Sequence, residues 1–387
     1  MSLLIKNKTL CCGCMACANV CPKNAITAKA DEQGFLYPQV NSALCVECGL
    51  CERVCDFQLK QQAVRAPQKA YSLIHKETGV VKHSTSGGAF TALSDWILAQ
   101  HGLVVGAAMD SDFTVYHHIA ETAGQRDAMR GSLYVQSDTR DSFRVVRQAL
   151  KEGRLVLFVG TPCQAAGLRS FLGKDYENLY VVEFLCHGVP NNDFLKSHIA
   201  WLESEHGKKA IGYSFRGKRY GWNHGIDEVV FETGRYADSL KVQAYRDFFQ
   251  KSVSLRPSCH NCSYRQWERA ADLTIGDFWG IEKLIGKQDT AGVSFILTNT
   301  EKGETLLKAV SDTAALQEYP LEKVQHRVSL KPSTSRIDPE KFWALYKKKG
   351  YAALVTRYHN LSFKKRSSFY LKKLGLRFAG GRKGRYE

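Results

Sequence analysis

The sequence predicts an α+β protein made of a small cysteine-rich module, a larger α/β domain and a basic tail. Residues 1–60 hold two runs of four cysteines, and a polar linker follows at 58–68. Residues 69–360 alternate short apolar runs with amphipathic stretches, a pattern typical of strands and helices in an α/β core. Residues 361–387 gather lysine and arginine among aromatic side chains.

Both cysteine runs read C-x2-C-x2-C-x3-C, which is the spacing of bacterial two-cluster ferredoxins. In those proteins the fourth cysteine of each run binds the other cluster, because one short loop supplies only three thiolates to a cluster. The ligands predicted for one 4Fe–4S cluster are therefore Cys11, Cys14, Cys17 and Cys55. The ligands predicted for the second are Cys45, Cys48, Cys51 and Cys21.

A zinc site and a disulfide framework are the alternatives for these cysteines. Zinc sites commonly use paired CxxC units with four ligands per metal, which two consecutive runs of four do not match. Disulfides need an oxidising compartment, whereas the N-terminus has no apolar signal core, so a cytoplasmic location is expected. Cys12 is the extra cysteine of the first run and is interpreted as a bystander.

The charge and composition of the chain limit which ligands and partners are expected. The chain of 387 residues carries a formal net charge of +16, and no apolar run approaches the roughly 20 residues that span a bilayer. Residues 1–60 are nearly balanced, so the positive excess lies in the rest of the chain. This charge attracts anionic ligands and surfaces. We recognise no nucleic-acid-binding motif, so nucleic acid is not expected as a partner.

Four further cysteines lie outside the first module: Cys163, Cys186, Cys259 and Cys262. The first two follow apolar runs at 155–159 and 179–185, which are typical of buried parallel strands. The carboxyl ends of such strands face one crevice, and the other two thiols form a CxxC pair in a polar loop. Together they suffice for a third 4Fe–4S cluster or one zinc ion. Two structural cysteines and an unrelated loop pair are the alternative.

Three other features suit an anionic ligand or its chemistry. Residues 84–88 place hydroxyls and two glycines before a helix predicted at 89–99, which suits a phosphate and is explained nearly as well by an N-cap. Residues 216–222 mix cations with aromatic rings and suit a planar anion, with a solvated loop as the alternative. His187 is a candidate proton relay, with a structural histidine as the alternative.

The basic tail at 361–387 is amphipathic, because its cations are interleaved with aromatic and aliphatic side chains. Such a segment suits an anionic membrane surface or an acidic partner. Peripheral contact with the inner face of the membrane is therefore one interpretation, and a solvated cationic tail is the other.

Several short motifs together resemble the coenzyme F420 hydrogenase/dehydrogenase beta-subunit family, whose members are iron–sulfur flavoproteins. They follow the family's order over residues 70–300: 86–93, 134–137, 160–164, 186–188, the Cys259/Cys262 pair and 276–280. A fused ferredoxin module is a variant within this family. The resemblance implies FAD and a further cluster near the flavin.

The resemblance also suggests that the 86–91 turn meets the flavin or its phosphates and that residues 134–137 line it. The candidates are Ser86, Gly87, Gly88, Thr91, Tyr134, Gln136 and Ser137. Arg216 and Lys218 join them, because their charge suits an anionic planar ligand.

One position departs from the family pattern. Leu133 stands where the family often has a lysine, which weakens the case for the deazaflavin F420 as substrate. The chain is more similar to a bacterial subgroup with FRxKRYGW-like and GDFWG-like segments, associated with surface-polysaccharide gene sets. In that subgroup the expected donor is ferredoxin, and the expected acceptor is a sugar-linked or other anionic substrate.

We therefore predict a flavin-dependent iron–sulfur oxidoreductase in which electrons pass between three clusters and FAD. Flavin suits this role because it exchanges single electrons with clusters and hydride with organic substrates. The donor would be ferredoxin, F420 or NAD(P)H, the substrate a small anion, and His187 the catalytic residue. The alternative is an electron-transfer adaptor that docks on a partner reductase. The direction of electron flow and self-association as a homo-oligomer are left open.

Overall fold

The computed structural model describes residues 7–55, 64–222, 225–234, 236–285, 291–325, 328, 333–359, 361, 367 and 369–371. Most of the predicted linker and nearly all of the basic tail lie outside these residues. Within the described part of the chain, no helix combines the length and apolarity needed to cross a bilayer.

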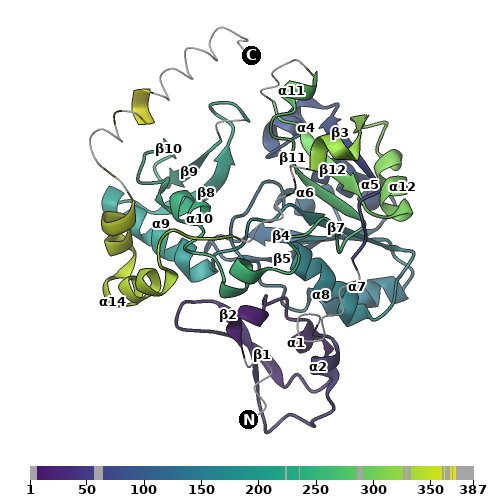
Figure 1. The fold of residues 1–387 in the computed structure, drawn as a ribbon, viewed down its shortest axis with the longest axis horizontal. Coiled ribbons are helices and arrows are strands. Elements are labelled where there is room, and N and C mark those ends of the chain that lie inside the picture. The colour runs from purple at the N-terminus through teal and green to yellow at the C-terminus, as the bar shows by residue number, and fades with distance from the viewer. Residues whose placement is uncertain are drawn as a thin grey trace.

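The cysteine-rich module packs as a small unit under one end of the larger domain, drawn purple in Figure 1. Its antiparallel hairpin is formed by β1 (Ile26–Ala30) and β2 (Leu36–Val40). The short helix η1 (Lys8–Leu10) precedes the first cysteine run, and the two runs contain the short helices α1 (Ala16–Val20) and α2 (Leu50–Arg53). Helix α1 contacts two helices of the larger domain, α7 (Ser142–Lys151) and α8 (Pro162–Leu172).

The larger domain is built on one mixed eight-stranded sheet. Its strand order is β13 (Ala314–Tyr319), β3 (Lys69–His75), β12 (Ser294–Thr298), β11 (Leu273–Asp277), β7 (Leu179–Phe184), β6 (Val156–Gly160), β4 (Leu103–Met109) and β5 (Val115–Ala120). Strands β4, β6, β7 and β11 run parallel, and the outer strands are antiparallel. The predicted α+β class and the parallel pairing of β6 with β7 are confirmed.

Helices cover both faces of this sheet because alternate strand residues point to opposite sides. On β4, Val104 packs toward α5 (Ala89–Ala99) and α12 (Glu301–Ala309), whereas Val105 packs toward α7 and α8. The shorter helices of this region are α4 (Thr78–His83), α6 (Ala123–Asp127), α11 (Glu282–Ile285) and α13 (Leu321–Val324). The carboxyl ends of the buried parallel strands, and the cysteines that follow them, therefore lie at the same edge of the sheet.

A second layer follows β7 and contains a separate three-stranded sheet (Figure 1). Its strands are β8 (Ala210–Gly217), β9 (Ile226–Phe231) and β10 (Tyr236–Ala237). Helices α9 (Asn192–His206), α10 (Ala244–Gln250) and α14 (Pro339–Tyr358), with the 3-10 helix η3 (Pro257–Asn261), complete it. Its aromatic core includes Phe194, Tyr245, Phe342 and Trp343, and Phe35 of the cysteine-rich module joins the same cluster. The two parts of the chain therefore share a core.

Candidate functional site

The first predicted ligand set lies together in the cysteine-rich module. Burial raises the pKa of the Cys17 thiol well above its usual value, and negative charge on Cys14, Cys11 and Cys55 raises it further. Cys11 is likewise affected by burial and by Cys14. The four residues are those that the spacing assigns to one cluster, so the fold brings the fourth cysteine of the second run to the first loop.

The second predicted set lies closer to the surface. Cys48 is exposed, whereas Cys21, Cys45 and Cys51 are half-buried. Cys21 and Cys51 pack against the same apolar pair, Cys17 and Ile26. The Sγ atom of Cys21 accepts a hydrogen bond from the N–H of Ala25 at 3.3 Å. The exchange of fourth ligands between the two runs is therefore compatible with this packing.

The four later cysteines line one cavity of about 200 Å³. Cys163 stands in the first turn of α8, Cys186 follows β7, and Cys259 and Cys262 belong to η3 and its end. Burial raises the pKa of Cys259 to about 12 and that of Cys262 to about 11, and the neighbouring thiols contribute to both shifts. The crevice expected from the strand ends is formed, and the CxxC loop closes it.

These thiols line the cavity from three segments of the chain. Among the described residues, no three His, Cys, Asp or Glu side chains are arranged to hold a single metal ion. Tetrahedral zinc at about 2.3 Å from each sulfur would require sulfurs about 3.8 Å apart. For this cavity, the third cluster and the zinc ion both stay predictions.

Cys12 occupies a place that the cysteine spacing did not predict. Its side chain is buried and lines the same cavity. Hydrogen-bonding contact with the Cys14 and Cys163 sulfurs raises its pKa well above the usual value, and burial adds to the effect. Cys12 therefore lies between the first ferredoxin group and the third group of thiols.

Residues 132–139 run from the candidate flavin site to the cysteine loop. Near one end, the Ser132 hydroxyl donates to Thr85 Oγ1 at 3.1 Å. The Gln136 side-chain amide donates to the Cys12 carbonyl at 2.8 Å, and the Thr139 hydroxyl donates to the Cys14 carbonyl at 3.0 Å. The segment thus contacts both sites through its side chains.

The turn at 84–88 is held by packing as well as by hydrogen bonds. A Cβ atom at Gly87 would collide with the Leu73 carbonyl, and Gly88 has a left-handed φ of 92° directly before α5. Both glycines are thus required by the local geometry. The Ser86 hydroxyl donates to the Val293 carbonyl at 2.6 Å. The Thr91 hydroxyl is buried with no hydrogen-bond partner among the described atoms.

Lys218 contacts this turn directly. Its ammonium group donates to the carbonyl oxygens of Val81, Ser86 and Ala291 at 2.8, 2.9 and 2.7 Å. Three donors on one ammonium match these three acceptors. The structure thus gives Lys218 a role in shaping the turn, and its predicted contact with a ligand stays a prediction.

Arg216 and Tyr134 form a second part of the candidate ligand site. Arg216 donates to Tyr134 Oη at 3.3 Å and pairs with Asp277 at 2.6 Å. Its guanidinium lies 4.8 Å from the ring centre of Trp279, which stacks on Trp222. A cation, a phenol and stacked indoles are therefore held together at the end of β8.

His187 lies in the wall of the cysteine cavity. Its Nε2 lies 3.0 Å from the Ser252 hydroxyl, and burial and the positive charge of Arg265 lower its pKa. The ring of Phe249 contacts His187 edge-on and stacks on Tyr134 at 4.6 Å. The Phe249 ring thereby joins the cavity to the residues predicted to line the flavin. Ser137, by contrast, accepts from Gln164 of α8 at 3.0 Å.

Two segments of this chain match known protein families. Residues 153–324 match the family described as the C terminus of the coenzyme F420 hydrogenase/dehydrogenase beta subunit. Residues 10–59 match the 4Fe-4S dicluster domain. Residues 153–324 therefore correspond to the C-terminal region of this family. An iron–sulfur dicluster module joined to the family's C-terminal region makes the chain a redox protein that transfers electrons.

Among solved structures, a chain of the F420-reducing [NiFe] hydrogenase complex from Methanosarcina barkeri is 20% identical. The similarity covers 76% of this chain and 92% of that one, with a TM-score of 0.45. No curated protein matches the chain.

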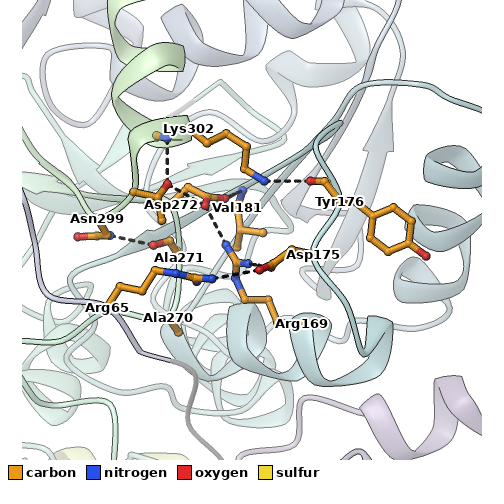
Figure 2. Close-up of polar contacts among 12 residues, drawn as sticks. Arg65, Arg169, Asp175, Tyr176, Val181, Ala270, Ala271, Asp272, Asn299 and Lys302 are labelled. Carbon is orange, nitrogen blue, oxygen red and sulfur yellow. Dashed lines mark hydrogen bonds and ion pairs between the residues drawn. The ribbon is translucent and has the colours of Figure 1, made fainter.

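A partly buried polar network, which includes Arg65, holds α8 against the sheet (Figure 2). Arg169 of α8 donates to Asp272 at 3.0 Å, and Asp272 accepts the backbone N–H of Val181 at 2.9 Å. Asp175 accepts from both Arg169 and Arg65 at 2.8 and 3.2 Å. Because Cys163 stands at the other end of α8, this network helps to hold one wall of the cavity in place.

Arg256 is the functional candidate that sequence reasoning missed. It is buried and contacts the Cys11 loop, yet it lies 245 residues away in the chain. The one signal in the sequence is an arginine next to Pro257 just before the CxxC pair.

Proposed function

We propose that the chain is an iron–sulfur flavoprotein oxidoreductase that passes electrons between two ferredoxin clusters, a third 4Fe–4S cluster and FAD. The observation that carries the proposal is the convergence of four cysteines from three distant segments on one cavity. That cavity adjoins the first ferredoxin group through Cys12. Two redox groups that lie this close to each other can exchange electrons.

The third cluster would be held by Cys163, Cys186, Cys259 and Cys262. Thiolates are the usual protein ligands of 4Fe–4S clusters. The raised pKa values of the Cys186, Cys259 and Cys262 thiols indicate that anionic sulfur is unfavourable here without bound cations. Iron would supply that positive charge, as it does wherever metal binding deprotonates a thiol.

FAD would be held by the turn at 86–88, Thr91, Tyr134 and Arg216, with Lys218 supporting the turn. The unpartnered Thr91 hydroxyl, the N-terminal end of α5 and the Arg216 cation fit an anionic planar group. Bound there, FAD would exchange single electrons with the clusters and hydride with a substrate. Gln136 and Ser137 continue the same segment toward the clusters.

The substrate is proposed to be a small anion, either F420 or a sugar-linked intermediate. The Arg216 guanidinium, which also pairs with Asp277, offers hydrogen-bond donors, and Trp279 is an exposed ring beside it that suits stacking. His187 is the proposed proton-handling residue, because its lowered pKa keeps the imidazole neutral near pH 7.

Anaerobic reconstitution tests the proposal. The full chain should bind about twelve irons, four for each 4Fe–4S cluster, and release FAD on denaturation. Cys259→Ser should lower the count to about eight irons. Ser258→Ala, at the neighbouring position of η3, is the matched control and should keep the full count. Each donor is then scored by flavin bleaching: reduced ferredoxin, F420 and NAD(P)H. A full-length protein that stays at about eight irons and binds no flavin would reject the proposal.

An electron-transfer adaptor is the second candidate function. It is favoured by the exposed Cys48 and by the exposed apolar side chains of Leu44 and Val46 beside it, which suit contact with a protein. Reduction of a small anionic substrate by the isolated chain would reject the adaptor, and reduction only in the presence of a partner reductase would support it.

A further inference from the structure

Arg256 buries a positive charge between two groups of cysteines. Its side chain is 0% exposed and lies just before η3. Among the described residues, no carboxylate forms an ion pair with it. An isolated buried charge is strongly unfavourable, so its guanidinium requires other negative charge or a full set of hydrogen bonds.

The hydrogen bonds of Arg256 tie the main domain to the cysteine-rich module. Its Nε donates to the Cys11 carbonyl at 2.7 Å, and its Nη2 donates to the Leu36 carbonyl at 3.0 Å. Its Nη1 donates to Gln136 Oε1 at 2.9 Å. The guanidinium also lies 4.2 Å from the centre of the Tyr37 ring. These contacts hold the guanidinium in one orientation.

Cysteine sulfurs lie next to Arg256, and they would carry negative charge when they bind a cluster. Its Nη2 lies 3.6 Å from Cys11 Sγ, within hydrogen-bonding distance for sulfur. Cys11, Tyr37, Cys12 and Cys259 all raise the pKa of Arg256 against the opposing effect of burial. The guanidinium is therefore placed against a predicted ligand of the first ferredoxin cluster and close to the third group of thiols.

We propose that Arg256 is a positioning residue that raises the reduction potential of the cluster held by Cys11, Cys14, Cys17 and Cys55. The cluster gains one negative charge when it takes up one electron, and a fixed positive charge stabilises the reduced form. A hydrogen bond to a ligand sulfur acts in the same direction. Arg256 thereby favours transfer of one electron to this cluster from the second cluster, which is held by Cys45, Cys48, Cys51 and Cys21 and is called the outer cluster below. The outer cluster is oxidised by one electron, and no proton is required.

The proposal deepens the electron-transfer function and depends on the two ferredoxin clusters only. It does not require FAD or the third cluster. Iron counting and flavin release report on those groups separately, so failure of the wider proposal would be distinguishable from failure of this one.

Redox titration of the full anaerobic chain, followed by electron paramagnetic resonance, tests it. Arg256→Met keeps much of the side-chain volume and removes the charge. The reduction potential of one cluster should then fall by at least about 59 mV, which is about a tenfold change in the equilibrium constant of a one-electron couple. Arg256→Lys retains the charge and should restore most of the difference. The outer cluster is the internal reference and should be unchanged.

Gln136→Glu covers the case in which Arg256→Met loses iron or fails to fold. This near-isosteric change places a carboxylate against the guanidinium, which neutralises its charge, and should lower the same potential. The shift should persist in about 0.5 M salt, because buried charges are weakly screened. A purely structural role would lower stability and leave the potentials unchanged. Unchanged potentials in variants with full iron content, or a shift of the outer cluster alone, would overturn the proposal.

Discussion

The Sγ atom of Cys14 lies against Gly167 of helix α8, so that a Cβ atom at Gly167 would stand 2.7 Å from that sulfur. The cysteine loop of the ferredoxin module therefore rests directly on the helix whose first turn carries Cys163. A glycine is needed here for close approach and not for an unusual backbone conformation.

We expect Gly167→Ala to push the cysteine loop away from α8. Overpacking of this kind costs about 1–3 kcal/mol. The thermal midpoint and the iron content should both fall. Gly79→Ala is the control, because Gly79 lies in helix α4 with open space around its Cβ position. Equal midpoints and iron contents for the two variants would show that the contact between Cys14 and Gly167 does not constrain the loop.

Cys12→Ala should keep the full iron content, because the cysteine spacing supplies eight other ligands to the two ferredoxin clusters. Cys163→Ala should lose about four irons under the same conditions. Iron and labile sulfide analysis of both variants makes the comparison. Loss of iron from Cys12→Ala would identify Cys12 as a ligand and correct the assignment made from the spacing.

Asp227→Asn should remove a contribution by which stability falls as pH rises. Asp227 is buried, accepts a hydrogen bond from Tyr213 Oη at 3.0 Å, and has a pKa raised by burial to about 7. An unfolded aspartate titrates near about 3.9, so between about pH 4 and 7 the folded chain binds a proton that the unfolded chain has released. The free energy of unfolding therefore falls as pH rises through this window, by up to about 1.4 kcal/mol per pH unit, and this contribution is constant above it.

Thermal midpoints at about pH 5 and about pH 7.5 measure this effect. The midpoint at about pH 5 minus the midpoint at about pH 7.5 should be lower in Asp227→Asn than in the unmodified chain. Asp112→Asn, at an exposed turn, is the control and should leave the difference unchanged. An identical pH dependence in Asp227→Asn and the unmodified chain would contradict the predicted protonation.

Val46→Glu should slow reduction by a protein donor. Leu44 and Val46 are 50% and 58% exposed beside Cys45, where the second cluster approaches the surface. A roughly tenfold slower reduction by ferredoxin corresponds to about 1.4 kcal/mol of docking free energy. Reduction by dithionite should be unaffected, because it needs no docking surface.

Ile211→Glu, on β8, is the matched control for Val46→Glu, because Ile211 is also an exposed aliphatic residue. Its reduction by ferredoxin should match that of the unmodified chain. Equal slowing in both variants would indicate a general effect of added negative charge and not a docking surface at the second cluster.

Local sequence patterns predicted the parts of the fold that depend on short segments. Apolar runs at 155–159 and 179–185 are the parallel pair β6 and β7, and the rule that parallel strand ends share a crevice placed Cys163 near Cys186. The antiparallel outer strand β13 was not anticipated, because its residues are largely exposed and carry little apolar alternation.

Contacts between distant segments account for what was missed. Arg256 meets Cys11, and Cys12 meets Cys163, across separations that leave no periodic signal in the chain. The contacts by which Lys218 shapes the turn were missed for a related reason, since its three carbonyl partners come from two other segments. The ligands of metal clusters are readable from spacing, whereas the residues that surround those clusters are determined by tertiary packing.

The segment from Ser132 to Thr139 also sets a length limit. Seven peptide steps reach at most about 25 Å even when fully stretched. The backbone of Ser132, which contacts Thr85, therefore lies within that distance of the backbone of Thr139, which contacts the Cys14 carbonyl, so the segment limits how far apart the turn at 84–88 and the Cys14 loop can lie.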